Sequence, residues 1–433
     1  MAKIISSEEA AALVKDNMTI GVGGFIGCGV PEELLVALEE RYLKTQTPRD
    51  LTLFHCAAVG DGGVRGANHL GHEGLLKKLI CGHIGLEPML NKLVVENKIP
   101  AFLIPQGVAC HLTRAIGGKK PGVLTHVGLK TFADPRLEGC KVNQAAYDCN
   151  EEVVSLVNIE GKDYLLYRYF PIDICFIKGS IADTDGNISL EKEAAVSEQM
   201  DLANATRNSG GIVVAQVEKI VQPGSLKAHD VKVHGFMVDY LVVGRPENNI
   251  QVWTMEGYHP ELSGEFRVPV EAIQPIPLNH RKICGRRGAL ELKKNCLINL
   301  GLGVPDAVAA VAGEEEISDY ITLSIESGVL GGVPLGGNGL GATVNPEAIY
   351  KQPDTFDVYD GGGVDMSFLG AAEIDEKGNV NVSKFGGRVV GPGGFIDISQ
   401  NTPNMYFTGT FTSGGLKTQV KDGKLHITHE GKN

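Results

Sequence analysis

The sequence lacks the features that would assign it to several special classes of protein. Residues 1–7 contain no apolar core of a secretion signal, and no apolar run approaches the roughly 20 residues of a membrane span. Forty lysines and arginines stand against 52 aspartates and glutamates, a net charge of −12. This balance argues against nucleic acid or an anionic membrane as the main partner. We expect a globular protein of the cytoplasm.

Paired cysteines and a zinc-ligand spacing are also missing. The nine cysteines are scattered and form no Cys-x-x-Cys pair, so reduced and buried thiols are expected. His69, His72 and Glu73 stand close together but lack the His-Glu-x-x-His spacing. A packing or surface role is favoured for them, and no metal site is predicted.

The sequence is rich in glycine, with 56 residues in 433, and it contains two internal echoes, pairs of segments in which the same sequence pattern recurs. Residues 11–31 read as an apolar segment, a strand, a glycine stretch and Gly-Val-Pro, and residues 289–305 repeat this order. Residues 173–188 and 365–380 form the second echo, each predicting a buried strand followed by a Gly-Asn turn. Either echo alone could be chance, but two in the same order indicate duplication.

The duplication predicts an α/β fold of two similar domains, each with a largely parallel sheet flanked by helices. The first domain is expected over residues 1–244 and the second over residues 279–433. The stretch between them, residues 245–278, is polar and rich in proline and is predicted to be a linker. An active site between the halves would follow naturally.

Glu326 stands at the end of a predicted strand. Residues 321–326 alternate between apolar and polar side chains, which places Glu326 on the polar side at the carboxyl end, where ligands of open α/β sheets bind. On spacing alone, a solvated surface carboxylate is the commoner interpretation. The equivalent position in the first half is Cys56, so the fold itself does not require a carboxylate there.

Two glycine loops share the pattern Gly-x-Gly-Gly-Phe, at residues 21–25 and 391–395. Glycines let the backbone approach a ligand closely, with N–H groups available for a phosphate or a developing oxyanion. The first loop is not a dinucleotide fingerprint, because Ile26 replaces its third glycine, and neither is a Walker loop. Sharp turns between strand and helix explain either loop equally well when it is taken alone.

Together these segments resemble the family I CoA-transferases. Residues 16–31 are similar to the amino-terminal signature of that family, and Pro105-Gln-Gly107 resembles its substrate-side segment. Four later segments resemble the other subunit of the family: residues 299–305, Glu326-Ser-Gly328, Leu369-Gly-Ala-Ala and residues 391–397. The likeness covers essentially the whole chain in order and is nearest to the fused propionate or acetate CoA-transferases.

The resemblance implies an alpha-subunit-like first domain and a beta-subunit-like second domain that carries the catalytic glutamate. It implies ping-pong transfer of CoA from a short-chain acyl-CoA to a small acid, such as acetate or propionate, through a glutamyl-CoA thioester on Glu326. CoA is then a substrate rather than a permanently bound cofactor, and the enzyme is a homodimer or homotetramer. Fused members continue beyond the position of Asn433, so the second domain is expected to be short at its C-terminus.

The other expected site residues are glycines, cations and an amide. Those expected to bind the oxyanion and CoA are Gly301, Gly303, Gly391, Gly393, Gly394, Lys384 and Arg388, although ordinary solvated charges explain the two cations equally well. Those expected to bind the substrate are Gln106, Gly107, Gly24 and Phe25, with Val108, Ala109 and Leu335 as candidates for the pocket wall.

Two other functions remain open. A thioester hydrolase could use the same glutamate with water as the acceptor, and the sequence separates it poorly from a transferase. A catalytically inactive relative that binds CoA esters, as a sensor or scaffold, is the third candidate.

Overall fold

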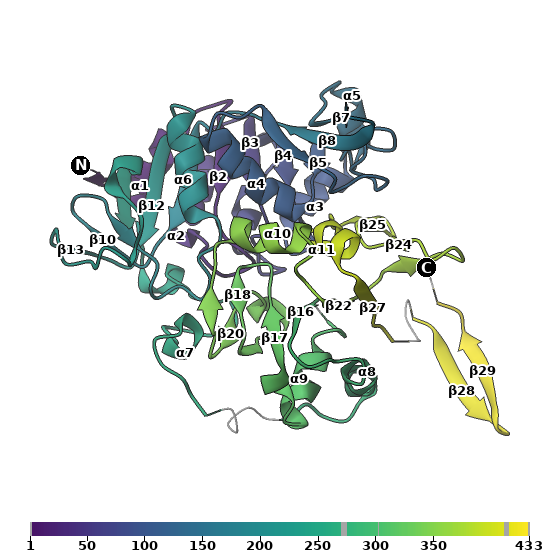
Figure 1. The fold of residues 1–433 in the computed structure, drawn as a ribbon. Coiled ribbons are helices and arrows are strands. Elements are labelled where there is room, and N and C mark those ends of the chain that lie inside the picture. Colours follow the sequence, from purple (N-terminus) through teal and green to yellow (C-terminus); the bar gives the residue numbers. More distant parts are fainter. Residues whose placement is uncertain (1, 270–274, 302, 411–414, 432–433) are drawn as a thin grey trace.

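Two β-sheets, one in each half of the chain, organise the molecule (Figure 1). The computed structural model describes residues 2–269, 275–301, 303–410 and 415–431. The first half forms the upper body in Figure 1 and most of the second half the lower one. Among the described residues, no helix is long and apolar enough to cross a membrane.

The first half is built on an eight-stranded sheet, in the order β1-β15-β12-β9-β2-β3-β4-β5, whose neighbouring strands all run parallel. Its central strands are apolar runs buried along their whole length, as expected for a parallel sheet covered on both faces. The strands are β1 (Lys3–Ile4), β2 (Thr19–Val22), β3 (Leu51–His55), β4 (Leu76–Cys81), β5 (Ala101–Leu103), β9 (Ile174–Lys178), β12 (Ile212–Val217) and β15 (Tyr240–Val243).

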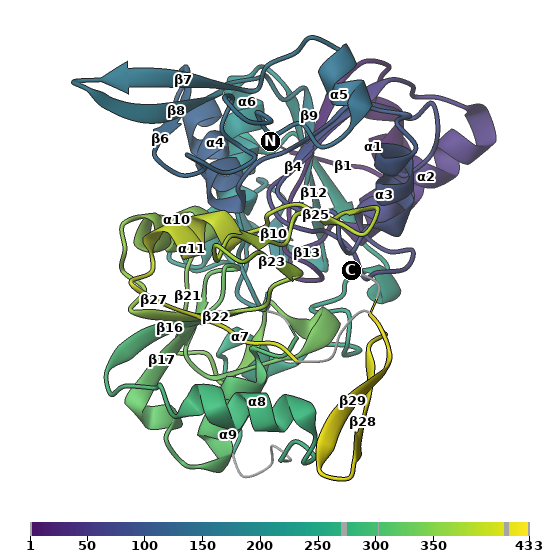
Figure 2. The ribbon, with the colours of Figure 1, turned by 90° about the vertical axis from the view of Figure 1, so that its right-hand side faces the viewer.

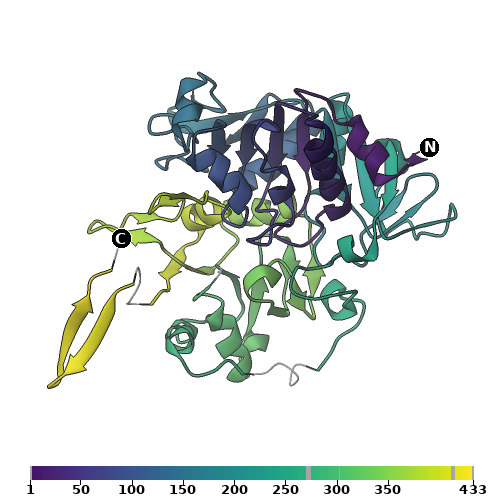
Figure 3. The same cartoon turned by 180° about the vertical axis from the view of Figure 1, so that it is seen from behind.

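Helices cover both faces of this sheet, as Figures 1 and 3 show from opposite sides. One face packs against α1 (Ser7–Leu13), α2 (Glu32–Thr45) and α3 (Pro88–Val95), and the other against α4 (Gln106–Gly117), α5 (Gln144–Asp148) and α6 (Gln199–Asn208). Helix α2 follows Pro31 and has Glu32 and Glu33 in its first turn, where carboxylates interact favourably with the helix dipole.

Smaller sheets extend the first half beyond the parallel core that was predicted. An antiparallel sheet of three strands, prominent at the top left of Figure 2, contains β6 (Gly122–Thr125), β7 (Val154–Ile159) and β8 (Lys162–Arg168). A mixed sheet of four strands contains β10 (Ile181–Asp183), β11 (Ile188–Ser189), β13 (Lys219–Val221) and β14 (Val231–Val233).

The second half has a six-stranded sheet in the order β21-β18-β17-β16-β22-β27. Four strands run parallel: β16 (Cys296–Leu300), β17 (Ile321–Ser324), β22 (Met366–Leu369) and β27 (Asn404–Phe407). At one end of the sheet, β18 (Val329–Leu330) pairs antiparallel with β17, and the edge strand β21 (Ala348–Ile349) pairs antiparallel with β18. The helices are α8 (His280–Ala289), α9 (Ala307–Glu314), α10 (Gln352–Asp360) and α11 (Phe395–Asn401).

Four two-stranded hairpins complete the described part of the second half. They are β19 (Val333–Pro334) with β20 (Thr343–Val344), β23 (Glu373–Ile374) with β24 (Val380–Asn381), β25 (Lys384–Phe385) with β26 (Arg388–Val389), and β28 (Lys417–Lys421) with β29 (Lys424–His429). The last of these projects away from both bodies (Figures 1 and 3).

The duplicated plan is visible in strand order and in individual hydrogen bonds. The order β3-β2-β9-β12 in the first sheet matches β17-β16-β22-β27 in the second. Asp173 accepts from the N–H of Thr19 at 2.7 Å, and its counterpart Asp365 accepts from the N–H of Leu297 at 2.8 Å. The internal echoes in the sequence therefore correspond to equivalent strands.

The two halves share one core at their interface. Helices α10 and α11 of the second half lie beside α4 of the first, and Phe356, Tyr359 and Ile396 belong to the same buried cluster as the residues of α4. Arg114 of α4 bridges the halves through Asp354 and Asp357. Burial of this apolar surface keeps the carboxyl ends of both sheets close together.

The segment predicted as a linker also packs against both halves in its described part. Val252 lies in a small buried cluster with Cys28 and Val329, and the indole N–H of Trp253 donates to the carbonyl of Ile26 at 2.8 Å. Residues 270–274 lie outside the described residues. The domain boundaries themselves stay a prediction.

Candidate active site

Glu326 follows β17 by two residues and sits in a tightly fixed turn. The hydroxyl of Ser327 donates to the carbonyl of Gly341 at 2.7 Å, and the N–H of Gly328 donates to the carbonyl of Ile325 at 2.9 Å. Gly328 has φ +108°, and a methyl group there would lie 1.9 Å from the carbonyl oxygen of Tyr350. Glycine is therefore required at this position, and the turn holds the Glu326 side chain in one place.

The Glu326 side chain faces a cavity of about 450 Å³ built by both halves. Apolar side chains dominate its wall. The first half contributes Phe25, Ile26, Ala58, His83, Leu86 and Gln106; the second contributes Gly301, Glu326, Leu340, residues 369–372, Val382, Phe385 and residues 390–395. Glu326 is the single carboxylate among the described residues that line it.

Burial dominates the electrostatics of Glu326. The apolar surroundings raise its pKa from 4.5 to about 7, and only a hydrogen bond from its own backbone opposes this shift. Behind it, the Tyr359 hydroxyl donates to Ser324 at 3.1 Å and accepts from the Asn299 amide at 3.2 Å. This buried network holds the end of β17, and it contributes no cation that would stabilise the ionised carboxylate.

The second glycine loop lies directly against Glu326. A methyl group on Gly394 would stand 3.0 Å from both Cγ and Oε1 of that side chain. Within the described part of the chain, the Gly394 N–H has no acceptor, whereas the N–H groups of Gly391 and Gly393 donate to the carbonyls of Ser383 and Gly82. Of the three predicted donors in this loop, only Gly394 is thus left with an N–H for a ligand.

Gln106, the first residue of α4, brings an amide to the same cavity. Its side chain is 3% exposed, and Nε2 has no hydrogen-bond partner among the described residues. Its backbone N–H donates to the carbonyl of Gly393 at 2.9 Å, which ties α4 to the glycine loop. A buried donor without an acceptor is costly, so this amide is suited to an oxygen of a bound ligand.

Several other predicted residues lie near the cavity without offering a free donor to it. Phe25 lines the cavity, but Gly24 does not, and the N–H of Gly24 donates to Glu198 at 3.0 Å. Gly107 packs against Asp397, where a methyl group would lie 2.4 Å from Oδ1. Gly301 lines the cavity with its N–H already given to the carbonyl of Phe368.

Gly303 and the three candidates for the pocket wall also lie outside this cavity. Gly303 is exposed, next to Leu302, which lies outside the described residues. Val108 and Ala109 point into the core of the first half and Leu335 into a small cluster beside it, so none of the three forms the pocket wall. Val108 and Ala109 lie on the part of α4 that is buried in the core, which explains the error for these two positions.

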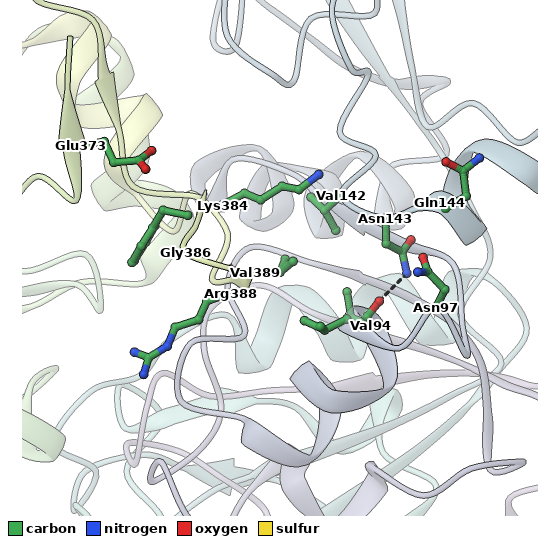
Figure 4. Close-up of a pocket in the computed structure, with 13 residues that line it drawn as sticks. Val94, Asn97, Val142, Asn143, Gln144, Glu373, Lys384, Gly386, Arg388 and Val389 are labelled. Carbon is green, nitrogen blue, oxygen red and sulfur yellow. Dashed lines mark hydrogen bonds between the residues drawn. The ribbon is translucent and has the colours of Figure 1, made fainter. Parts of the chain in front are cut away.

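Lys384 and Arg388 belong to a second cavity, of about 490 Å³, beside the first (Figure 4). Phe385 lines both cavities. Lys384 extends toward Val142 and Asn143 of the first half, whereas the guanidinium of Arg388 points away from them. The β25–β26 hairpin that carries both cations thus bridges the two halves.

The sequence analysis missed His83, Leu86, Ala58 and the segment 369–372 as cavity residues. Each follows the carboxyl end of a parallel strand: β4 for His83 and Leu86, β3 for Ala58 and β22 for residues 369–372. The rule that ligands bind at carboxyl ends of strands could have found them, since it was applied only to β17.

Most of the cysteines are free and buried, and the two histidines His69 and His72 have a packing role, as the sequence analysis expected. All nine cysteines are free; six are buried, while Cys149, Cys284 and Cys296 are half-buried. His69 contacts Glu39 at 2.5 Å and Glu32 at 3.1 Å, and His72 contacts Glu39 at 2.6 Å. These histidines therefore pack against carboxylates of α2.

Comparison with known proteins identifies the family. A family model described as Coenzyme A transferase matches residues 4–244, more than half of the chain. The caffeate CoA-transferase of Acetobacterium woodii is 43% identical over 439 residues, covering 100% of this chain and 83% of that protein. The chain belongs to the coenzyme A transferase family.

Two further proteins are similar to this coenzyme A transferase over nearly its whole length. The acetate CoA-transferase YdiF of Escherichia coli K12 is 38% identical over 431 residues, covering 99% of this chain and 80% of that protein. The acyl-CoA transferase YdiF of E. coli O157:H7, in a thioester complex with CoA, superposes with a TM-score of 0.90 at 37% identity, covering 100% of this chain and 81% of that one. The protein is thus an enzyme that transfers CoA from an acyl-CoA to a carboxylate. Its oligomeric state and its cytoplasmic location stay predictions.

Proposed function

We propose that Glu326 is the nucleophile and carries CoA between two acids as a glutamyl thioester. The observation that supports this most strongly is its position: among the residues that the structure describes, it is the single carboxylate lining a largely apolar cavity, with Gly394 against it and the free amide of Gln106 in the same wall. A carboxylate in such surroundings is poorly solvated, which makes it a better nucleophile than one in water.

The proposed exchange runs through two acyl intermediates. An oxygen of the Glu326 carboxylate attacks the thioester carbonyl of the acyl-CoA, and the C–S bond breaks to give a glutamyl–acyl anhydride and CoA thiolate. The thiolate then attacks the glutamyl carbonyl, forming the glutamyl-CoA thioester and releasing the first acid as its carboxylate. The second acid repeats these steps in reverse and leaves as its own CoA ester.

No proton or electron is left over in this exchange, so the proposal requires no permanently bound cofactor and no metal. Each attack passes through a tetrahedral oxyanion, which needs hydrogen-bond donors. The N–H of Gly394 and the amide of Gln106 are the donors that we assign, each contributing about 3 kcal/mol on the scale of known oxyanion holes. Gln106 can equally bind the carboxylate of the incoming acid.

We assign the phosphate-bearing end of CoA to the second cavity. Phe385 lines both cavities, so a ligand can extend from Glu326 along the β25–β26 hairpin. Lys384 and Arg388 take part in no ion pair among the described residues and remain available for phosphates. Binding energy from this remote part of the substrate can then be used to position the thioester.

The acid is proposed to be a short-chain carboxylate such as acetate or propionate. One observation favours a wider range, because a cavity of about 450 Å³ walled by Phe25, Leu86 and Leu340 has more room than an acetyl group fills. A larger apolar acid is therefore the second candidate, in agreement with the caffeate enzyme among the relatives.

Rates with a panel of acceptor acids test the substrate. We expect thiol release from acyl-CoA to be slow alone and to accelerate when an acceptor acid is added. A series running from acetate and propionate through hexanoate to a cinnamate-type acid shows which size gives the highest kcat/KM. A rate of thiol release indifferent to every acid would favour the hydrolase, and stabilisation by CoA esters without any turnover would favour the inactive relative.

A further inference from the structure

A buried histidine and a buried glutamate face each other behind the first-half wall of the cavity. His55 is the last residue of β3, and Glu87 immediately precedes α3; both side chains are fully buried. Nε2 of His55 lies 3.6 Å from Oε2 of Glu87, and neither atom has a hydrogen-bond partner among the described residues. A shift of a few tenths of an ångström would make this contact a hydrogen bond.

The other polar atom of each side chain is already bound to the loop after β3. Nδ1 of His55 lies 2.6 Å from the carbonyl of Ala57, so this nitrogen carries the proton and Nε2 keeps its lone pair. Oε1 of Glu87 accepts from the N–H of Val59 at 2.5 Å. The contact between the two side chains therefore closes a bridge from the loop after β3 to the loop after β4.

Burial keeps both groups neutral near pH 7. It lowers the pKa of His55 to about 4 and raises the pKa of Glu87 to about 8. A protonated Glu87 can donate its O–H to the lone pair on Nε2. Two further titratable groups influence the pair: Cys81 of β4, and His83, whose pKa is lowered to about 4 by burial and by His55.

The bridged loops carry cavity residues and hold the catalytic glycine loop. Ala58, His83 and Leu86 all line the cavity. The carbonyl of Gly82 accepts from the N–H of Gly393, and the N–H of Ile84 donates to the carbonyl of Val390, each with a distance below 3.0 Å. Continuous contacts therefore run from the pair through residues 82–87 to Gly394 at Glu326.

We propose that His55 and Glu87 are a positioning pair: as a neutral acid–imidazole contact, they lock the loops after β3 and β4 together and hold the cavity wall and the glycine loop in register with Glu326. The proposal rests on the function assigned to Glu326 above. Neither side chain touches the reacting atoms. The pair acts by fixing the backbone that does.

Three variants test the pair by steady-state kinetics. Glu87→Leu removes both hydrogen-bonding atoms, and we expect kcat/KM for acyl-CoA to fall about 10- to 100-fold, as for other displacements near a reacting centre. Glu87→Gln keeps the shape, the acceptor for Val59 and a donor for His55, so it should retain kcat/KM to within about threefold of the parent, because the contact is neutral. Glu96→Gln, at an exposed position directly after the same helix, is the matched control.

The pH profile supplies a second readout that also works if Glu87→Leu fails to fold. Ionisation of Glu87 above about pH 8 breaks its donation to His55, so kcat/KM of the parent should decline there. The Glu87→Gln variant, which cannot ionise, should lose this decline. Glu198 has a similarly raised pKa, and only the variant separates the two groups.

Two results would overturn the positioning pair. One is a Glu87→Gln variant as impaired as Glu87→Leu, which would mean that an ionised Glu87 is needed. The other is an alkaline decline that is unchanged in Glu87→Gln. Failure of the Glu326 assignment is recognised separately, because the parent would then form no CoA adduct on Glu326 whatever residue occupies position 87.

Discussion

The end of β3 and the end of β17 occupy the same place in two sheets of matching strand order, but they present different chemistry. Cys56 follows β3 and is 1% exposed, in a core shared with Phe54 and Ile80. Glu326 follows β17 and faces a cavity. Burial raises the pKa of both groups, to about 11 for the thiol and about 7 for the carboxyl.

The difference follows from the neighbouring strand. β3 is flanked by β4, a parallel strand of six residues, and Cys56 beyond the end of β3 belongs to the same buried cluster as Ile80 of β4. β17 is flanked by β18, which returns antiparallel directly after the turn at Ser327 and Gly328, so that Ser324 pairs with Leu330. The reversal leaves Glu326 on the turn and open to the cavity. The same strand end therefore occurs in both sheets, but only the one after β17 presents a reactive side chain to the cavity.

The difference in roles between Glu326 and Cys56 is tested most strongly by replacing each side chain in turn. Glu326→Gln should lower kcat for CoA transfer by at least about 10⁴-fold, because the amide cannot form the anhydride. Cys56→Ala should stay within about threefold of the parent in kcat, with a loss of about 1 kcal/mol in the free energy of unfolding. Steady-state kinetics and urea denaturation measure both, and equal losses of activity in the two variants would contradict the difference in roles.

A smaller change adds one methyl group beside Glu326. Gly394→Ala places this methyl 3.0 Å from the carboxylate, at a backbone conformation that alanine adopts freely, with φ −81°. We expect kcat/KM to fall about 100-fold, because the nucleophile is displaced from its attack position. Gly409→Ala, which meets nothing within 4 Å, is the control. Full activity of Gly394→Ala would show that this loop does not position the carboxylate.

The next prediction concerns the unpartnered amide of Gln106, which the first half contributes to the cavity around Glu326 of the second half. Gln106→Leu should lower kcat/KM for the acceptor acid about 100-fold, the usual loss for one oxyanion-hole donor. Gln106→Glu should be worse, because it adds a negative charge facing the acid. Both variants are compared by varying the acid at saturating acyl-CoA. An unchanged KM and kcat in Gln106→Leu would exclude the assigned role.

The smallest change is a change of pH, which alters the protonation of Glu326 without a mutation. The carboxylate is the active form and its pKa is raised to about 7, so activity is present above that pH and lost as the pH falls through it. Each further pH unit downward should cost about tenfold in kcat/KM. Thermal melts at the same pH values control for unfolding. A flat profile between about pH 5 and pH 7 would show that Glu326 is already ionised there.

The sequence was most informative where strand periodicity and glycine patterns act locally. The echoes around Thr19 and Leu297, and around Asp173 and Asp365, predicted equivalent strands, because buried parallel strands need continuous apolar runs. The antiparallel sheet of β6, β7 and β8 was missed, since its half-exposed strands give no such run.

The site was predicted in part. Glu326 stands beyond the carboxyl end of β17 and was selected by strand-end reasoning together with family resemblance, whereas Gln106, the first residue of α4, was selected by family resemblance. The state of each N–H could not be predicted, because the acceptor for Gly391, Ser383, depends on how the second half folds, and the acceptor for Gly393, Gly82, depends on how the halves pack. The same holds for His55 and Glu87, which are 32 positions apart and meet only through the order of β3 and β4.

The most direct test of the account is the mass of the protein after incubation with acyl-CoA and no acceptor acid. We predict a covalent CoA adduct that maps to the peptide containing Glu326, disappears when an acceptor acid is added, and is absent from Glu326→Gln while present in Cys56→Ala. Turnover without any adduct on that peptide, or an adduct that persists in Glu326→Gln, would contradict the assignment of Glu326 as the carrier of CoA.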